Sequence, residues 1–317
     1  MNQPLFEVKD LKKNFRSGKT VTKAVDGVSF DIYRGEVLGV VGESGCGKTT
    51  CGRTVVGLYG KDGGQVLYKG EDVHAMRGLK RAKFCREVQT IFQDPYSSLD
   101  GRNHVCDLIA EGLDIQRLVS SPAERLDRVK ELMNQVGLNL SGLHRYPHEF
   151  SGGMRQRIGI ARALAVNPEF ILCDEPISAL DVSIQAQIIN LLMDLREEKG
   201  LTYLMISHDL SMVKHISDRI IVMYLGKIVE TCPAVELYEH PAHPYTQALI
   251  SAIPIADPRI ERERERIILS GQVPSPSGKP KGCAFAGRCR FATDRCREEE
   301  PCLREIAPGH QVACHLV

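Results

Sequence analysis

A glycine-rich stretch with the sequence GESGCGKT, at Gly42–Thr49, constrains the fold of this chain more than any other feature. It matches the pattern G-x-x-x-x-G-K-S/T. The apolar run EVLGVVG before it predicts a buried strand, and a helical pattern starts at Lys48. Glycines allow backbone N–H groups to turn inward around phosphate oxygens, and a helix N-terminus adds positive potential. The stretch therefore predicts a strand, a phosphate-binding loop and a helix in succession.

Several side chains of this stretch suit a bound nucleotide. Lys48 can reach the β- and γ-phosphates, and the Thr49 hydroxyl can bind Mg²⁺. Cys46 lies inside the loop, so alkylation of its thiol is expected to block the nucleotide. The other residues expected to contact the nucleotide here are Gly42, Ser44, Gly45, Gly47 and Thr50. A chance glycine-rich turn is the alternative, and the predicted strand and helix on either side argue against it.

An acidic pair, Asp174 and Glu175, ends a second predicted strand in the run FILCDEP. A strand that ends in an acid is expected beside a phosphate loop, where Asp174 would hold the Mg²⁺ shell. Glu175 follows directly and is placed to polarise an attacking water molecule. A structural ion pair is the alternative role for Glu175.

Strand-like runs alternate with helical patterns along the chain, which favours an α/β fold with a parallel sheet covered by helices. EVQTIFQ and LTYLMISH are further predicted strands, and VSIQAQIINLLMDLREEKG predicts an amphipathic helix that ends at Gly200. Residues from about 101 to 167 have a mostly helical pattern and predict a helical subdomain. From residue 256 the chain is charged and then rich in Pro, Ser and Gly, so we expect a main domain at 1–255 and an extension at 256–317.

The charge balance and the N-terminus narrow the class of protein. Lys and Arg number 41 against 40 Asp and Glu, and this balance argues against nucleic acid as a partner. The N-terminus lacks the apolar core of a signal peptide, and no apolar run approaches the roughly 20 residues that span a bilayer. We therefore expect a soluble, cytosolic protein, in which structural disulfides are rare.

A second anion-binding helix N-terminus is predicted at Ser151–Leu164, with the sequence SGGMRQRIGIARAL. One nucleotide does not need two such sites. The simplest solution is that Ser151 and Gly153 act on a nucleotide held by a partner chain. Arg155 and Arg157 are expected to be cations on the surface of this helix.

Together these motifs resemble those of ATP-binding-cassette (ABC) ATPases, in order, over roughly residues 5–230. SGGMRQR resembles the family signature, GESGCGKT its phosphate loop, ILCDE its metal strand and SALD its D-loop. Gln93 in IFQDP resembles the Q-loop glutamine, His208 in LMISHDL the switch histidine, and Phe15 the aromatic residue under the adenine. The resemblance implies a P-loop ABC ATPase core, in which a parallel sheet is joined by an antiparallel β subdomain and a helical subdomain.

The resemblance also implies roles for single residues. Glu175 would be the catalytic base, and His208 would contact the γ-phosphate. Gln93 would touch Mg²⁺ or water and report to a membrane partner. The Mg²⁺ contacts would come from Thr49, Gln93 and Asp174. A core position is the alternative for Phe15, and a soluble ABC ATPase that acts on ribosomes or DNA is a less favoured alternative function.

The C-terminal region resembles a narrower group, the ATPases of bacterial dipeptide, oligopeptide and nickel importers. The resemblance rests on HPYTQALISAIP at His243–Pro254, on LSGQVPSP and on the cysteine-rich tail. It implies an ATPase at the cytoplasmic face of the membrane, dimeric with a related ATPase, beneath two permease subunits that a solute-binding protein supplies. Peptide is the expected solute, and nickel or a sugar is the alternative, because no residue of the ATPase touches the solute.

Five of the eleven cysteines lie between Cys283 and Cys314, with the spacing C-x5-C-x6-C-x5-C-x11-C. Zinc modules favour closer pairs, whereas iron–sulfur clusters accept varied spacing. In the importer group a similar tail is associated with a 4Fe–4S cluster, and the matching positions are Cys283, Cys289, Cys296 and Cys314. Cys302 departs from that pattern. Zinc and metal-free or oxidised thiols stay open as alternatives, as does the choice between a structural and a redox-sensing role.

Overall fold

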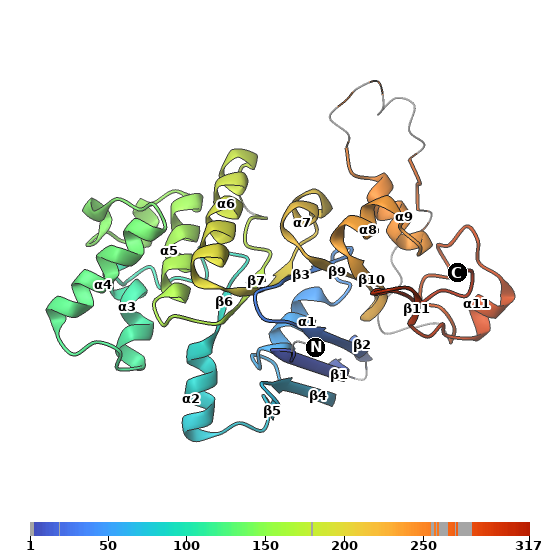
Figure 1. The fold of residues 1–317 in the computed structure, drawn as a ribbon, viewed down its shortest axis with the longest axis horizontal. Coiled ribbons are helices and arrows are strands. Elements are labelled where there is room, and N and C mark those ends of the chain that lie inside the picture. Colours follow the sequence, from blue (N-terminus) through green and yellow to red (C-terminus); the bar gives the residue numbers. More distant parts are fainter. Residues whose placement is uncertain are drawn as a thin grey trace. The chain divides into compact units, whose positions relative to one another are not determined.

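The computed structural model describes residues 3–18, 20–178, 180–254, 257, 259, 266–269, 271 and 281–317 (Figure 1). The chain divides into two compact units. Unit 1 comprises Met1–Gln3, Tyr33–Glu36 and Glu71–Met205, and unit 2 comprises Pro4–Ile32, Val37–Gly70 and Ile206–Val317. Most of the charged and Pro-rich segment after residue 255 lies outside the described residues, as does Ala179 of the SALD motif.

An antiparallel sheet forms the first part of unit 2. β1 (Phe6–Ser17) pairs with β2 (Thr20–Ile32) and with β4 (Gly63–Tyr68). Phe6 and Val8, which point to one face of β1, are buried, as a sheet with one covered face requires. This sheet corresponds to the antiparallel β subdomain that the family resemblance implies.

The remaining strands of unit 2 lie in the order β11-β12-β10-β9-β3. Their bounds are Val37–Val41 (β3), Arg219–Tyr224 (β9), Lys227–Pro233 (β10), Arg304–Ala307 (β11) and His310–Val312 (β12). β3 and β9 are parallel, but β10 and β12 each run antiparallel to their neighbours. The chain reverses between β9 and β10 through a two-residue turn, Leu225–Gly226, with φ of 44° and 78°. The sheet is therefore mixed: β3 and β9 have the predicted parallel arrangement, and β10, β12 and β11 add an antiparallel edge.

The cysteine-rich tail is built into unit 2. It supplies β11 and β12, and Thr231 of β10 pairs with Gln311 of β12. Phe285 is 2% exposed, and its ring centroid lies 5.3 Å from that of Tyr224 and 5.4 Å from that of Tyr245. The tail therefore shares a hydrophobic core with the strands of unit 2.

Short helices complete the described part of unit 2. They are α1 (Lys48–Val55), α7 (Leu210–Ile216), α8 (Ala234–Glu239), α9 (Pro244–Ser251) and α11 (Asp294–Glu298). α9 begins with a proline at its first position, and His243 before it caps the helix by accepting a hydrogen bond of 3.0 Å from the Tyr245 N–H.

Unit 1 combines four strands with a group of helices. β6 (Val88–Ile91) is parallel to β7 (Phe170–Asp174), and β8 (Thr202–Ile206), whose last residue belongs to unit 2, lies beside β7. The short strand β5 spans Glu71–Asp72. The helices are α2 (Gly78–Glu87), α3 (Val105–Ile115), α4 (Pro122–Gln135), α5 (Gly152–Leu164) and α6 (Val182–Lys199), with 3-10 turns at Leu140–Gly142 and Pro147–Glu149. α3, α4 and α5 pack against one another (Figure 1).

The structure confirms the elements that the local sequence patterns predict. The strands expected in EVLGVVG, EVQTIFQ, FILCDEP and LTYLMISH are β3, β6, β7 and β8. The amphipathic helix is α6, and it ends at Gly200, whose φ of 66° is left-handed. None of the helices in the described part of the chain combines the length and the apolar character needed to cross a bilayer.

Candidate functional site

The predicted phosphate loop turns sharply between β3 and α1. Gly42 and Gly47 have φ of 150° and 105°, in the region that favours glycine. A Cβ atom on Gly47 would lie 2.1 Å from the carbonyl oxygen of Ala24, and one on Gly42 would lie 2.3 Å from that of Met223. Both glycines are therefore required by backbone conformation and by space.

Lys48 is folded onto this loop. Its side chain is 4% exposed, and its Nζ donates hydrogen bonds of 2.7 Å to Gly42 O and 3.0 Å to Glu43 O. Thr49 and Thr50 follow in the first turn of α1, where both are half-buried. Ser44 and Gly45 are exposed at the tip of the loop. The loop thus presents its tip to solvent while its lysine stays close to the backbone.

Cys46 has an environment that disfavours reaction. It is 2% exposed, and burial raises the pKa of its thiol. Alkylation requires an accessible thiolate. Because the thiol is buried and its pKa is raised, we expect Cys46 to be alkylated only slowly.

His208 and Phe15 lie elsewhere in unit 2. His208 is exposed and follows Ser207, whose N–H donates a 3.2 Å hydrogen bond to Val40 O at the end of β3 that leads into the loop. Phe15 on β1 is 43% exposed, so the alternative interpretation of Phe15 as a core residue is wrong. Its ring meets Tyr59 edge-on, with the ring centroids 5.8 Å apart.

Unit 1 brings Gln93 and Glu175 together. Gln93 Nε2 donates a 2.9 Å hydrogen bond to Glu175 Oε2. They meet because β6 and β7 are parallel neighbours, with Ile91 opposite Cys173, and each side chain follows the carboxyl end of its strand. Asp174 is completely buried at the end of β7. Glu175 has φ of 49°, a conformation that costs free energy in a residue other than glycine.

The signature helix α5 begins with a side-chain cap. The Ser151 hydroxyl accepts a 3.4 Å hydrogen bond from the Met154 N–H, and Ser151 itself is exposed. Gly153 lies under α6, where an added Cβ would approach the Ile184 Cγ2 atom to 2.4 Å. The helix can therefore pack closely on α6 only with glycine at this position.

The prediction that Arg155 lies on the surface of α5 is wrong, whereas Arg157 is half-buried. Arg155 is 8% exposed, donates from Nε to Pro147 O at 2.6 Å, and lies 3.9 Å from the ring centroid of Tyr96. Arg157 donates from Nη1 to Val136 O at 2.5 Å. Through these hydrogen bonds both arginines connect α5 to backbone carbonyl groups of neighbouring segments of unit 1.

The candidate nucleotide-binding residues fall into two groups. Unit 2 carries Phe15, the loop residues 42–50 and His208, and unit 1 carries Gln93, Ser151, Gly153, Asp174 and Glu175. Local sequence patterns identify both groups, but they give no signal for the Gln93–Glu175 contact, which depends on strand order.

Four of the five tail cysteines influence one another. Burial is the main cause that raises the pKa of Cys283 to about 11, and the nearby Cys296, Cys314 and Cys289 contribute in the same direction. Cys283 N–H also donates a 2.8 Å hydrogen bond to Cys296 O. The raised pKa of Cys283 means that a cation would be needed to keep this thiol ionised.

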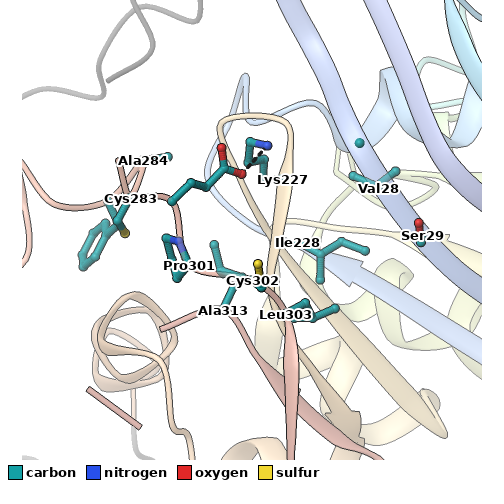
Figure 2. A pocket seen from close by; sticks show the side chains of 14 residues that line it. Val28, Ser29, Lys227, Ile228, Cys283, Ala284, Pro301, Cys302, Leu303 and Ala313 are labelled. Atoms are coloured by element: carbon teal, nitrogen blue, oxygen red, sulfur yellow. Dashed lines mark ion pairs between the residues drawn. The ribbon is translucent and has the colours of Figure 1, made fainter. Parts of the chain in front are cut away.

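The fifth tail cysteine, Cys302, is exposed. It lines a cavity of about 380 Å³ together with Cys283, Ile228 and Ala313 (Figure 2). At its rim Lys227 forms an ion pair with Glu300, with Nζ and Oε1 2.5 Å apart.

A second group of potential ligands was not predicted from the sequence. Atoms of Glu230, Cys232 and His310 lie within 4.8 Å of one another, and all three residues are buried. The Glu230 carboxylate is already occupied by hydrogen bonds from His310 Nε2 at 2.8 Å and from the N–H groups of Ala242 and His243 at 2.8 and 2.9 Å. We interpret this group as a buried hydrogen-bond network that ties β12 to β10 and to the start of α9.

The fold and these residues define the class of P-loop nucleotide-binding proteins, because the loop connects a buried strand to a helix and an acid ends a parallel strand. A family model described as "ABC transporter" matches residues 25–178. A second model, described as "Oligopeptide/dipeptide transporter, C-terminal region", matches residues 229–296.

Curated relatives match the chain over nearly its full length. The putative oligopeptide transport ATP-binding protein YkfD of Bacillus subtilis is 56% identical, over 99% of this chain and 95% of that protein. The oligopeptide transport ATP-binding protein OppF of the same organism is 55% identical, over 99% of this chain and 97% of that protein. The chain belongs to the ABC transporter family of ATP-binding proteins.

Solved structures agree with this assignment. A dimeric, post-hydrolysis structure of the ATP-binding cassette MJ0796 bound to ADP and Pi has a TM-score of 0.67 and 28% identity, and covers 72% of this chain and 98% of that one. The cbiO1 protein from Clostridium perfringens, part of the ABC transporter complex cbiONQ, has a TM-score of 0.66 and 25% identity, over 75% and 92% of the two chains.

Proposed function

We propose that this chain is the ATP-hydrolysing subunit that powers import of di- and oligopeptides through a membrane ABC importer. The observation that carries the proposal is the near full-length match to oligopeptide transport ATP-binding proteins, at 55 and 56% identity. The match to the C-terminal family model, at residues 229–296, supports the same branch of the family. Nickel or sugar import is the alternative in this branch.

The proposed nucleotide site rests on the residues of the sequence motifs. The loop residues Gly42, Ser44, Gly45, Cys46, Gly47, Lys48, Thr49 and Thr50 would hold the phosphates, and Phe15 would stack on the adenine. The exposed face of Phe15 and the exposed loop tip support these roles. The chemistry of a hydroxyl, an amide and a carboxylate at Thr49, Gln93 and Asp174 fits Mg²⁺, which prefers oxygen ligands and would neutralise phosphate charge.

In the proposed reaction Glu175 orients and activates water. Its carboxylate accepts a hydrogen bond from the uncharged amide of Gln93, and this hydrogen bond orients the carboxylate. His208 would contact the γ-phosphate. Ser151 and Gly153 would bind the nucleotide of a homologous ATPase subunit, so that the chain works as one half of a dimer.

The proposed assembly places the chain at the cytoplasmic face of the membrane. Two permease subunits would lie above the ATPase pair, and an external solute-binding protein would deliver the peptide. The near-neutral charge, 41 basic against 40 acidic residues, supports a role without nucleic acid. We also propose the division into a nucleotide-binding domain at 1–255, with its helical subdomain at about 101–167, and a C-terminal extension at 256–317.

We propose further that Cys283, Cys289, Cys296 and Cys314 hold a 4Fe–4S cluster with a structural role. The mutual influence of these thiols supports a shared site. Among the residues that the structure describes, only Glu230, Cys232 and His310 bring three ligand atoms within 4.8 Å of one another. A single zinc ion, with sulfur ligands at about 2.3 Å, requires a tighter group than the tail thiols form. Iron, sulfide and zinc analysis after anaerobic purification tests this, and stoichiometric zinc without iron would refute it.

The experiment for the proposed function compares two variants in the complete transporter. Lys48→Ala should abolish nucleotide binding or turnover. Glu175→Gln should keep ATP binding but stop hydrolysis, because the amide cannot accept the proton of water. Hydrolysis by Glu175→Gln at the wild-type rate would show that the base assignment is wrong.

A further inference from the structure

Glu43 of the phosphate loop bonds to residues of unit 2 far from it in sequence, Tyr245 and Arg288. Its carbonyl oxygen accepts hydrogen bonds from Lys48 Nζ at 3.0 Å and from the Cys46 N–H at 3.2 Å. Its N–H donates a 2.8 Å hydrogen bond to the Tyr245 hydroxyl. Its carboxylate is paired with the guanidinium of Arg288. Every polar group of Glu43 is therefore occupied by a neighbouring residue.

The pair with Arg288 joins the loop to the cysteine-rich tail. Arg288 Nη1 lies 2.6 Å from Glu43 Oε2, and Nη2 lies 3.0 Å from Glu43 Oε1. The arginine side chain is 8% exposed, so the pair is better shielded from water than a surface ion pair. Arg288 sits between Cys283 and Cys289, in the segment that also buries Phe285.

Several neighbours fix the position of Tyr245, whose hydroxyl contacts Glu43. Tyr245 is completely buried, and its ring packs on Tyr224 and Phe285 with centroids 4.7 and 5.4 Å away. It lies in the first turn of α9, and the His243 N–H before this helix donates a hydrogen bond to Glu230. The hydroxyl that accepts from Glu43 therefore belongs to a rigid part of the core.

We propose that Arg288 and Tyr245 are positioning residues that hold the phosphate loop through Glu43, so that the cysteine-rich tail sets the affinity of the chain for nucleotide. The proposal deepens, and rests on, the proposed nucleotide site. Lys48 approaches Glu43 O from within the loop, while Arg288 and Tyr245 restrain the same residue from outside. A loop held in its binding conformation before the nucleotide arrives loses less entropy on binding.

The test measures binding of ADP with Mg²⁺ to the full-length protein by calorimetry. Arg288→Ala should weaken ADP binding about three- to tenfold, a factor that corresponds to roughly 1 kcal/mol of lost preorganisation. Tyr245→Phe removes only the hydroxyl and should weaken binding in the same direction. Arg290→Ala is the matched control, because Arg290 is exposed two residues along and lies over the ring of Phe291. It should bind ADP as the wild type does.

Two further readouts separate positioning from general destabilisation. In steady-state hydrolysis Arg288→Ala should raise KM with little change in kcat, and Arg288→Lys should recover part of the loss. Because coupling between sites is reciprocal, ADP should slow amide hydrogen exchange at residues 283–289 in the wild type but not in Arg288→Ala. If Arg288→Ala does not fold, Arg288→Lys and Tyr245→Phe carry the comparison.

The outcomes distinguish this proposal from the proposed function. The positioning role is refuted if the wild type and Arg288→Ala bind ADP with affinities within twofold of each other. It is also refuted if ADP does not change amide hydrogen exchange at residues 283–289 of the wild type. If the wild type binds no nucleotide, and Lys48→Ala changes nothing, it is the proposed nucleotide site that fails.

Discussion

Gly47→Ala tests whether the phosphate loop is shaped by close backbone contact. The φ of 105° at Gly47 disfavours any side chain, at a cost on the order of 1–2 kcal/mol. In addition, the new Cβ would lie 2.1 Å from Ala24 O, well inside van der Waals contact, so β2 or the loop must move. We expect a lower melting temperature and loss of ADP binding.

Gly45→Ala is the matched control for this change. Gly45 also has a positive φ, of 78°, but nothing lies within 4 Å of an added Cβ. Gly45→Ala should therefore lower the free energy of unfolding only by the backbone cost of the positive φ, about 1–2 kcal/mol. Its melting temperature should fall less than that of Gly47→Ala. Calorimetric melting and ADP titration of both variants measure the difference. Equal melting temperatures and equal ADP affinities for the two variants would refute the steric argument.

Three further predictions concern the core, pH and helix packing. Phe285→Ala should lower the free energy of unfolding by about 3–5 kcal/mol, measured by urea titration, because Phe285 is 2% exposed; a change below 1 kcal/mol would show that the tail is not part of the core. Burial lowers the pKa of His243 from 6.5 to about 4. Between these pH values the unfolded chain therefore binds a proton at His243 that the folded chain does not bind. Stability should therefore be lost as pH falls from about 6.5 to 4, by about 3 kcal/mol, and His243→Asn should flatten this part of the profile. Gly153→Val should push α5 from α6, since an added Cβ already lies 2.4 Å from Ile184, and should lower the melting temperature more than Gly159→Val, where nothing lies within 4 Å.

The phosphate loop could be predicted from sequence because its strand, glycines and helix are contiguous. All five residues of β3 are buried, and so the apolar run is continuous and easy to recognise. The acid at the end of β7 carries an equally local signal. These elements needed no knowledge of how distant segments pair.

Other parts of the site depend on contacts between distant residues. Gln93 and Glu175 are 82 positions apart and meet only because β6 lies beside β7. β12 has only three residues, too few for a periodic pattern, so its pairing with β10 could not be foreseen. The sequence pattern places Arg155 on a helix, but it does not reveal that its guanidinium donates hydrogen bonds to the carbonyl groups of Pro147 and His148. The Arg288–Glu43 pair spans 245 positions and has no local signal.

The most direct test of the central claim is peptide uptake by cells whose importer carries this chain as wild type or as Glu175→Gln. We expect ATP-dependent uptake of a labelled oligopeptide with the wild type, and none with Glu175→Gln even though that variant still binds ATP. Uptake of nickel but not of peptide by the wild type would contradict the proposed solute. Normal peptide uptake with Glu175→Gln would contradict the claim that hydrolysis at this site powers import.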